Sequence, residues 1–324
     1  MKRSRCAATL LALLLFLACL IPAVRADYKQ AVSYYNRGQF DKAIQELKPD
    51  LDQNPDWEFG HRLVGLCYLG LKNNALAVSS LSRAVQLKST AFSTYLGLGQ
   101  AYFNMQKYKD TVQILAQGEP FLAKEKEPEK ERYRLLHLRG SANFRMQQYA
   151  DAVNDLTSAL RISGNEWSDY SQLGAAYYQL NRHDEAIQAL QRASALNPGQ
   201  NVNTDLLGKA YFKKGIAALS NKQYADAIDN LRRAREFDPK DGYIYYNLAE
   251  AYLFQKNYVE AEKALNQALE IMPKSSEVFQ RLGLIYEKQK KWDQSLSAYQ
   301  KAYDAKPSPG LKEALARVAE AKKR

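Results

Sequence analysis

Apolar and small residues recur along the chain in a pattern that repeats every 34 residues. One clear copy has an aromatic residue, a leucine with a small neighbour and a tyrosine, then an alanine, a leucine, a second alanine and a closing proline. These residues are Tyr245, Leu248, Ala249, Tyr252, Ala261, Leu265, Ala268 and Pro273. Within each half the apolar spacings of three and four predict a helix, so one copy predicts two helices joined by a turn.

The first alanine of the second helix marks the register of each copy. The chain contains eight such markers, at Ala43, Ala77, Thr111, Ala152, Ala186, Ala227, Ala261 and Ser295. Neighbouring markers lie 34 residues apart, except that Thr111 to Ala152 and Ala186 to Ala227 each span 41. The copies are therefore grouped as three, two and three, with seven residues inserted at each boundary.

This pattern resembles the tetratricopeptide-repeat family over about residues 27–307. The resemblance implies an all-α fold, a right-handed superhelical solenoid of antiparallel helix pairs. Small residues such as Gly140 let the two helices of a pair approach closely, while a leucine of the second helix fills the groove with the next pair. Each pair buries its apolar face only by stacking on its neighbours.

Some copies depart from the family's pattern. Asp50 and Gly118 stand where the second helix usually has a late alanine, and Asn143 and Ala218 stand where the first helix usually has a tyrosine. We expect these copies to be less regular than the others.

The insertions and the C-terminus define the expected segments. Gly118 and Pro120 should shorten the third repeat, and a charged connector should lead into a lengthened helix that starts near Pro128. Gly199–Thr204 is expected to be a loop, and Ser308 should cap a terminal helix with a polar outer face. The expected segments are a signal peptide at 1–26, repeats 1–3 at 27–123, the connector with repeats 4–5 at 124–200, repeats 6–8 at 201–307, and a capping helix at 308–324.

Residues 1–26 differ from the repeats. Basic residues precede an apolar run from Ala7 to Ile21, and Val24-Arg25-Ala26 resembles a small-x-small cleavage site. The run is shorter than the roughly 20 residues of a membrane-spanning helix, which favours a cleaved secretory signal over a retained anchor. Phe16 and Leu17 before Cys19 do not match a lipobox, which disfavours a lipoprotein. After cleavage we expect no stable membrane insertion.

Loss of this segment changes the cysteine and charge balance. Cys67 would be the one remaining cysteine of three, so no intramolecular disulfide could form. Export without cysteine pairs favours a bacterial periplasm or cell envelope. The formal net charge of +11 would fall to +7, distributed over helices of mixed sign. The sequence has no basic stripe interleaved with stacking aromatics, which argues against nucleic-acid binding.

The sequence offers no catalytic or metal-binding motif. His61 and His183 fall at register positions of packing aromatics, and His137 faces the groove without an acidic partner at ligand spacing. GxSxG and GxxxxGK[ST] motifs are absent, and Cys67 is expected to be a buried, inert thiol. We therefore predict that the chain is not an enzyme and uses no cofactor or metal.

In the tetratricopeptide family the first helices of successive repeats line a concave groove. The resemblance places in it Tyr28, Tyr35, Leu66, Phe103, His137, Phe144, Tyr178, Phe212, Tyr246, Asn247, Glu250, Phe254 and Arg281. Tyrosine and phenylalanine often anchor partners at interfaces; the alternative is that some of these rings pack between helices. Anchors are densest around Tyr246 and Phe254, so the main contact is expected there, with the repeats around Tyr28 and Tyr35 as the second choice.

These features predict a non-catalytic scaffold that binds a peptide or protein segment in its groove, within a cell-envelope complex. The family's chaperone-tail carboxylate clamp is matched in the last three repeats only at Asn247 and Arg281. An extended or helical segment with apolar anchors is therefore the expected ligand. The alternative is a structural subunit that self-associates or packs permanently into an envelope assembly. The two differ in oligomeric state, because a binding module should stay monomeric without its partner.

Processing of the N-terminus can be tested directly. If the signal is cleaved after Ala26, the exported protein begins at Asp27. N-terminal sequencing and intact mass of the exported form measure this. Retention of Met1, or a lipid on Cys19, would contradict the prediction.

Overall fold

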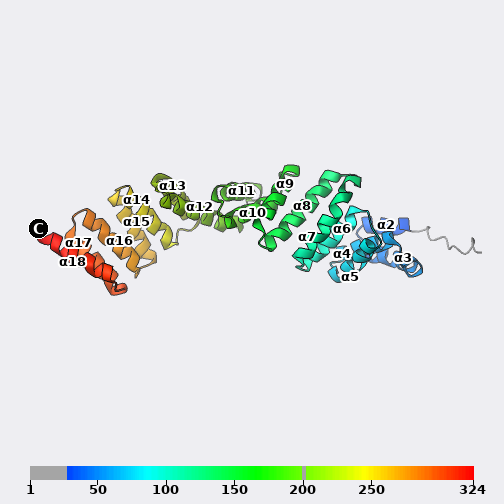
Figure 1. The fold of residues 1–324 in the computed structure, drawn as a ribbon, viewed down its shortest axis with the longest axis horizontal. Coiled ribbons are helices and arrows are strands. Elements are labelled where there is room, and N and C mark those ends of the chain that lie inside the picture. The colour runs from blue at the N-terminus through cyan, green and yellow to red at the C-terminus, as the bar shows by residue number, and fades with distance from the viewer. Residues whose placement is uncertain (1–27, 199–201) are drawn as a thin grey trace, which may run out of the picture. The chain divides into compact units, whose positions relative to one another are not determined.

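The computed structural model describes residues 28–198 and 202–324. Within these ranges the chain is all-α, with 17 α-helices and one short 3-10 helix and no strand, as the sequence predicted (Figure 1). The signal-peptide prediction lies outside the described residues. No helix in the described part of the chain combines the length and apolar character needed to cross a membrane. The helices form two compact units, which divide between Ile162 and Ser163.

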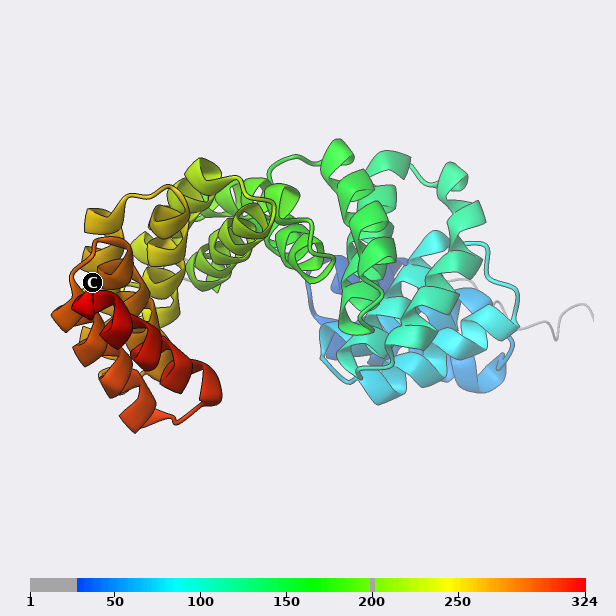
Figure 2. The same ribbon diagram turned by 60° about the vertical axis from the view of Figure 1, so that its left-hand side comes forward.

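Each unit contains four antiparallel helix pairs (Figure 2). Unit 1 contains α2 (Tyr28–Asn36) with α3 (Phe40–Gln53), α4 (Glu58–Gly70) with α5 (Asn74–Gln86), α6 (Phe92–Asn104) with α7 (Tyr108–Gly118), the 3-10 helix η1 (Glu119–Lys124), and α8 (Pro128–Arg145) with α9 (Tyr149–Ile162). Unit 2 contains α10 (Trp167–Gln179) with α11 (His183–Leu196), α12 (Val202–Ser220) with α13 (Tyr224–Phe237), α14 (Gly242–Phe254) with α15 (Tyr258–Ile271), α16 (Ser276–Lys288) with α17 (Trp292–Ala305), and the terminal helix α18 (Pro309–Lys323).

Every pair turns at one residue with a left-handed backbone. These residues are Gly38, Lys72, Gln106, Gln147, Asn181, Lys222, Lys256 and Lys290. The next N–H in each turn donates to the carbonyl five positions before it, at 2.8–2.9 Å, which closes the end of the first helix. Seven of the eight residues carry a side chain, at a conformational cost of about 1–2 kcal/mol each. The turns follow the 34- and 41-residue spacing, which confirms the eight copies.

A glycine in the first helix lies against a leucine of the second in five of the pairs. These contacts are Gly65 with Leu81, Gly99 with Leu115, Gly140 with Leu156, Gly174 with Leu190 and Gly215 with Leu231. A Cβ atom added to the glycine would lie 2.5–3.1 Å from the leucine Cγ, and all five leucines are fully buried. The small residue thus sets the distance between the two helices, as expected.

Two copies have a hydroxyl residue in place of the alanine at the marker position. Thr111 and Ser295 stand at the alanine marker, and their hydroxyls donate to the carbonyls of Gly99 (3.3 Å) and Gly283 (2.8 Å). Both hydroxyls are therefore satisfied although the side chains are fully buried. These copies keep the regular helix pair.

Asn143, which replaces the usual tyrosine, belongs to a buried polar network in the fourth pair. Its Nδ2 donates to Asp155 Oδ2 at 3.1 Å, and Arg139 donates to the same carboxylate from Nη2 at 2.7 Å. Arg139 also donates to Glu119 of η1 at 2.9 Å. Asp155 is 8% exposed, so its charge requires these partners. The network ties the connector to α8 and α9.

The first insertion behaves as predicted. Helix α7 ends at Gly118 after 11 residues, and α8 begins at Pro128 and is lengthened to 18 residues. Its first turn carries Glu129 and Glu131, which suit the positive end of the helix dipole.

The loop predicted at Gly199–Thr204 is wrong in its second half, because α12 already begins at Val202 and runs for 19 residues. Residues 199–201 lie outside the described residues. Asn203 is 1% exposed, and its Oδ1 accepts a hydrogen bond from Ser171 Oγ at 2.6 Å. A tertiary contact thus uses the amide oxygen that we expected to serve a loop backbone. Both insertions therefore lengthen the first helix of the following pair.

The terminal helix has the predicted cap and apolar face. Ser308 Oγ accepts a hydrogen bond from the N–H of Leu311 at 3.3 Å. Leu311, Ala314 and Val318 are buried in a cluster with Tyr299 of α17. This contact covers the apolar side of the last pair.

The Gly174 contact gives a stability test. Leucine at position 174 should overpack the pair, because its Cβ would lie 2.6 Å from Leu190 Cγ and 3.2 Å from the carbonyl oxygen of Ala186. We expect Gly174→Leu to lower the free energy of unfolding by about 1–3 kcal/mol. Hydrogen exchange should lose protection first in α10 and α11.

Gly310→Leu is the matched control. No atom lies within 4 Å of a Cβ at Gly310, so this variant should keep the wild-type stability. Equal loss of protection along the whole of unit 2 in Gly174→Leu would contradict a nearest-neighbour array.

Candidate functional site

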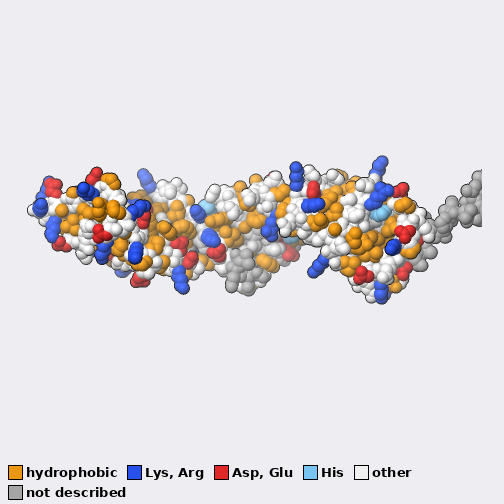
Figure 3. Space-filling model, turned by 90° about the horizontal axis from the view of Figure 1, so that it is seen from below, with side chains coloured by type: hydrophobic (Ala, Val, Ile, Leu, Met, Phe, Trp, Pro, Cys, Tyr) orange, Lys and Arg blue, Asp and Glu red, His pale blue; other side chains and the backbone are white. Residues whose placement is uncertain are grey.

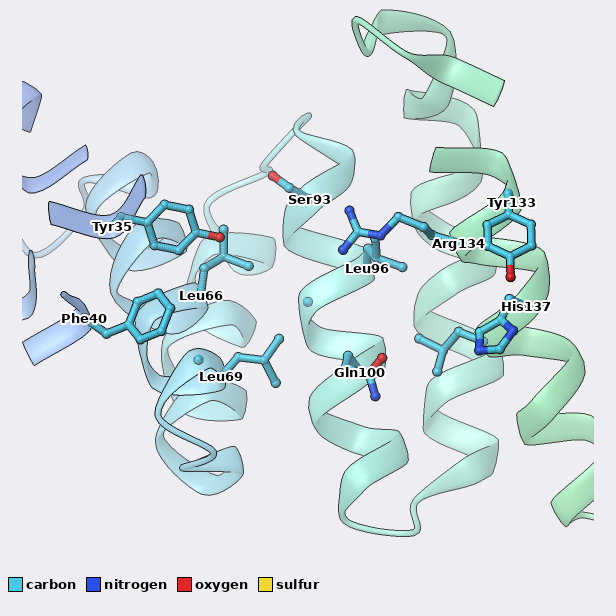
Figure 4. Close-up of a pocket in the computed structure, with 13 residues that line it drawn as sticks. Tyr35, Phe40, Leu66, Leu69, Ser93, Leu96, Gln100, Tyr133, Arg134 and His137 are labelled. Carbon is cyan, nitrogen blue, oxygen red and sulfur yellow. The ribbon is translucent and has the colours of Figure 1, made fainter. Parts of the chain in front are cut away.

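A cavity of about 360 Å³ lies on the first-helix face of unit 1, the face formed by α2, α4, α6 and α8. Leu66 and Leu69 of α4, with Leu96 of α6, supply its aliphatic surface. Figure 4 shows these side chains between Tyr35 at one end and His137 at the other. The full lining is Tyr35, Phe40, Leu66, Leu69, Gly70, Ser93, Leu96, Gly97, Gln100, Tyr133, Arg134, His137 and Leu138.

A glycine of α6 lies among the residues that line this cavity. A Cβ at Gly97 would approach Leu66 Cδ2 to 2.7 Å and Leu81 Cδ1 to 3.3 Å. Another residue at this position would therefore force Leu66 to move. The neighbouring first helices carry Leu63 and Leu138 at the corresponding register positions.

Most of the residues that line the cavity are apolar, and the one permanent charge among them is positive. Arg134 is the one lining residue with a permanent charge, and no carboxylate belongs to the lining. Its Nη1 donates to both carboxylate oxygens of Glu131 at 3.1 Å, one helical turn away. Burial raises the pKa of the Tyr35 hydroxyl, so this group stays a neutral hydrogen-bond donor at physiological pH.

His137 stacks on Tyr133 in the same helix, with 5.9 Å between ring centroids. Both rings line the cavity at the end formed by α8. The sequence placed His137 in the groove, and the structure places it at this cavity.

Four of the predicted groove aromatics contact the residue five positions later, across the turn of their own pair. The ring pairs are Tyr35–Phe40, Phe103–Tyr108, Phe144–Tyr149 and Tyr178–His183, with centroids 5.4–6.1 Å apart. These rings pack across the hairpin turn. This agrees with the alternative stated for the groove aromatics, in which some of the rings pack between helices. Tyr35 is the member of this set that also lines the cavity.

Tyr28 and Phe212 lie apart from the cavity. Tyr28 is 38% exposed and packs edge-on against Phe59, at 5.4 Å between centroids. Phe212 is half-buried against the core of unit 2.

In unit 2 three predicted residues form one polar cluster. Arg281 of α16 donates from Nε to the Tyr246 hydroxyl at 3.1 Å, and its Nη2 lies 2.6 Å from Glu250 Oε1. Burial opposes the charge of Arg281, but the hydrogen bond from Arg281 to Tyr246 and the charge of Glu250 outweigh it and raise the pKa of Arg281. The structure thus brings the three residues together and pairs them with one another.

The two remaining predicted residues of that region point elsewhere. Asn247 Nδ2 donates to the carbonyl of Tyr243 in its own helix at 2.7 Å. Phe254 is 56% exposed and stacks on Tyr224 of the preceding pair, with 5.2 Å between centroids. They do not join the cluster of Tyr246, Glu250 and Arg281.

Sequence reasoning missed the residues that α8 contributes beyond His137. Tyr133 and Arg134 lie one turn before His137, at the register positions of Phe92 and Ser93 in α6. The available signal was the helical spacing to His137, because residues one turn apart share a helix face. Phe40 was missed because it belongs to a second helix.

Comparison with known proteins agrees with this architecture. Four family models described as tetratricopeptide repeat match residues 28–94, 169–200, 218–285 and 278–313, which together cover more than half of the chain. The chain belongs to the tetratricopeptide-repeat family.

Curated relatives match parts of the chain. Small glutamine-rich tetratricopeptide repeat-containing protein 2 of Mycosarcoma maydis is 32% identical over 114 residues, 35% of this chain and 30% of that protein. Hsp70-Hsp90 organizing protein 2 of Arabidopsis thaliana is 28% identical over 218 residues, 65% of this chain and 35% of that protein. The chain thus spans about a third of the length of these relatives.

Among solved structures, the crystal structure of MamA protein aligns with a TM-score of 0.41 at 22% identity. The alignment covers 54% of this chain and 92% of that chain.

The other two histidines of this tetratricopeptide-repeat chain have structural contacts. His61 Nε2 lies 2.8 Å from the carbonyl of Pro55, six residues earlier. Tyr95 and Tyr245, at the same register position, donate to the carbonyls six residues before them at 2.8 and 3.0 Å. His61 therefore replaces a packing aromatic, as predicted, and His183 does so beside Tyr178.

The described ranges hold no cluster of three or more His, Cys, Asp or Glu side chains able to enclose an ion. On the face in Figure 3, cationic and anionic side chains of the described residues are interspersed with apolar ones.

The Cys67 thiol gives a test of reactivity. Burial, with a smaller contribution from the charge of Asp41, raises its pKa to about 12, and the side chain is fully buried. At about pH 8.5, where an ordinary thiol is half ionised, we expect iodoacetamide to modify Cys67 more than about a hundredfold more slowly in the native protein than in urea. Mass spectrometry of the Cys67 peptide measures both rates, and equal rates would contradict a buried thiol.

Proposed function

We propose that this chain is a non-catalytic scaffold that binds a segment of another polypeptide on the first-helix face of unit 1. The observation that carries the proposal is the cavity between Tyr35 and His137, which four successive helix pairs build together. Its aliphatic side chains can bury an apolar anchor, and its polar edge can orient the bound segment.

Two further observations favour unit 1 over the region around Tyr246. In unit 2 the Arg281 side chain is 37% exposed and is held by both Tyr246 and Glu250, so a ligand would have to replace two contacts. In unit 1 the Arg134 side chain is 55% exposed and pairs with Glu131. In unit 1, Leu66 and Leu69 remain half-buried and available to a ligand. The Arabidopsis relative is named as an organizing protein of Hsp70 and Hsp90, and a role in assembling proteins would suit this chain.

We also propose that the chain acts after export, in a bacterial periplasm or cell envelope. The basic and apolar pattern of residues 1–26 supports this location, as does the lone cysteine that would remain after cleavage. Partner proteins would then be components of an envelope complex.

Selection from a displayed library of random 12-residue peptides tests the binding function. Peptides enriched on the mature protein should bind it as isolated molecules, and the double variant Leu66→Ala/Leu69→Ala should weaken them by about tenfold or more, because it removes the aliphatic anchor contacts. Isothermal titration of wild type and variant gives the affinities.

Leu76→Ala is the matched control. Leu76 is 44% exposed and does not line the cavity, so its truncation should leave the affinity unchanged. If Tyr246→Ala/Phe254→Ala abolished binding while the unit 1 variant kept it, the site would lie in unit 2. Failure to select any peptide, with a mass that rises with concentration, would favour the self-associating subunit.

A further inference from the structure

We propose that the unit 1 cavity selects peptides in which an acidic side chain neighbours an aliphatic or aromatic anchor. Arg134 is the residue that binds the acidic side chain. The inference rests on the proposed function and adds the chemical class of the partner. It depends on the charge of the lining, because Arg134 is its one permanent charge and no Asp or Glu belongs to it.

Arg134 is placed to reach a ligand. Figure 4 shows its guanidinium extending from α8 above Leu96, on the side of the cavity that faces Tyr35. The Arg134 side chain is 55% exposed, so a ligand can reach it from solvent. A planar guanidinium binds a carboxylate through two parallel hydrogen bonds, which favours an acidic group over a neutral one.

Arg134 already pairs with a carboxylate of α8. Arg134 Nη1 contacts both oxygens of Glu131 at 3.1 Å, an ion pair between residues one turn apart. The Glu131 side chain is 19% exposed, so a ligand carboxylate has to replace it at the more exposed Arg134. Pairs one turn apart on a helix surface contribute a few tenths of a kcal/mol. A ligand carboxylate beside the apolar surface can therefore compete with Glu131 for Arg134.

The position of the apolar surface fixes the second requirement. Leu66, Leu69 and Leu96 lie beside Arg134 in the same cavity, so the anchor and the acid must be close neighbours in the ligand. The Tyr35 hydroxyl, on the opposite side, provides a neutral donor to the same ligand.

The acid is expected on a side chain and not at the end of a polypeptide. The cavity crosses all four helix pairs of unit 1, from Tyr35 on α2 to Tyr133 on α8, and Arg134 stands beside its middle (Figure 4). A segment that contacts both ends therefore continues past Arg134 on either side. A chain terminus at Arg134 would leave half of the lining without contacts.

Capped synthetic peptides test this chemistry. A peptide selected on the mature protein is made with its acidic residue intact and with Glu→Gln or Asp→Asn, both acetylated and amidated. The acidic form should bind about tenfold more tightly, the size expected for a hydrogen bond to a charged group. The preference should shrink as salt is raised, because this edge is open to solvent.

Variants of α8 assign the preference to Arg134. Arg134→Glu should abolish it or reverse it in favour of a lysine at the same peptide position, and Arg134→Lys should restore part of it. Glu131→Gln should tighten binding of the acidic peptide, because it removes the competing carboxylate. Arg132→Glu is the matched control, since Arg132 is exposed on the same helix and does not line the cavity.

The outcomes separate this inference from the proposed function. If Leu66→Ala/Leu69→Ala weakens binding but Arg134→Glu leaves the acidic preference intact, the peptide site stands and the role of Arg134 is wrong. If the neutral peptide with a free C-terminal carboxylate binds as tightly as the capped acidic one, the site recognises a C-terminal carboxylate instead of an acidic side chain. This result would overturn the inference. If peptides bind regardless of both sets of variants, the cavity itself is not the site.

Discussion

The close approach of the two helices within each pair is the contact on which the rest of the structure depends. At Gly174 and its four equivalents the leucine of the second helix lies where a Cβ atom would otherwise be. With this spacing, each pair has apolar surface on the two sides that face its neighbouring pairs. Only a neighbouring pair can cover this surface, so the contact inside one repeat creates the need for the next.

The array tolerates substitutions that keep this spacing. Thr111 and Ser295 add a hydroxyl at the marker position and satisfy it on the glycine carbonyl across the pair. Asn143 gives up the usual aromatic ring and joins Asp155 and Arg139 in a network instead. In each case a hydrogen bond takes the place of local packing.

The candidate site combines a small residue on one first helix with polar and aromatic residues on the next. Gly97 stands where the neighbouring first helices carry Leu63 and Leu138, and Leu66 packs close to it. Tyr133 and Arg134 of α8 line the cavity from the register positions that Phe92 and Ser93 hold in α6. The candidate site of unit 1 therefore depends on which side chains stand at these positions, because the helix-pair spacing is common to all eight copies.

The sequence by itself determined the helix pairs, their number and their register, because these depend on periodic local contacts that recur every 34 residues. It also identified His61 as a replacement for a packing aromatic and Cys67 as a buried thiol, since register position predicts burial. It could not determine which groove aromatics are available, because Phe103 and Phe144 share their register position with Tyr35, and of these three only Tyr35 lines the cavity. It also misjudged Asn203, whose amide is used by Ser171 of another helix. The cavity and the closed cluster around Arg281 were decided only by tertiary structure, because each depends on the distance between side chains from different repeats.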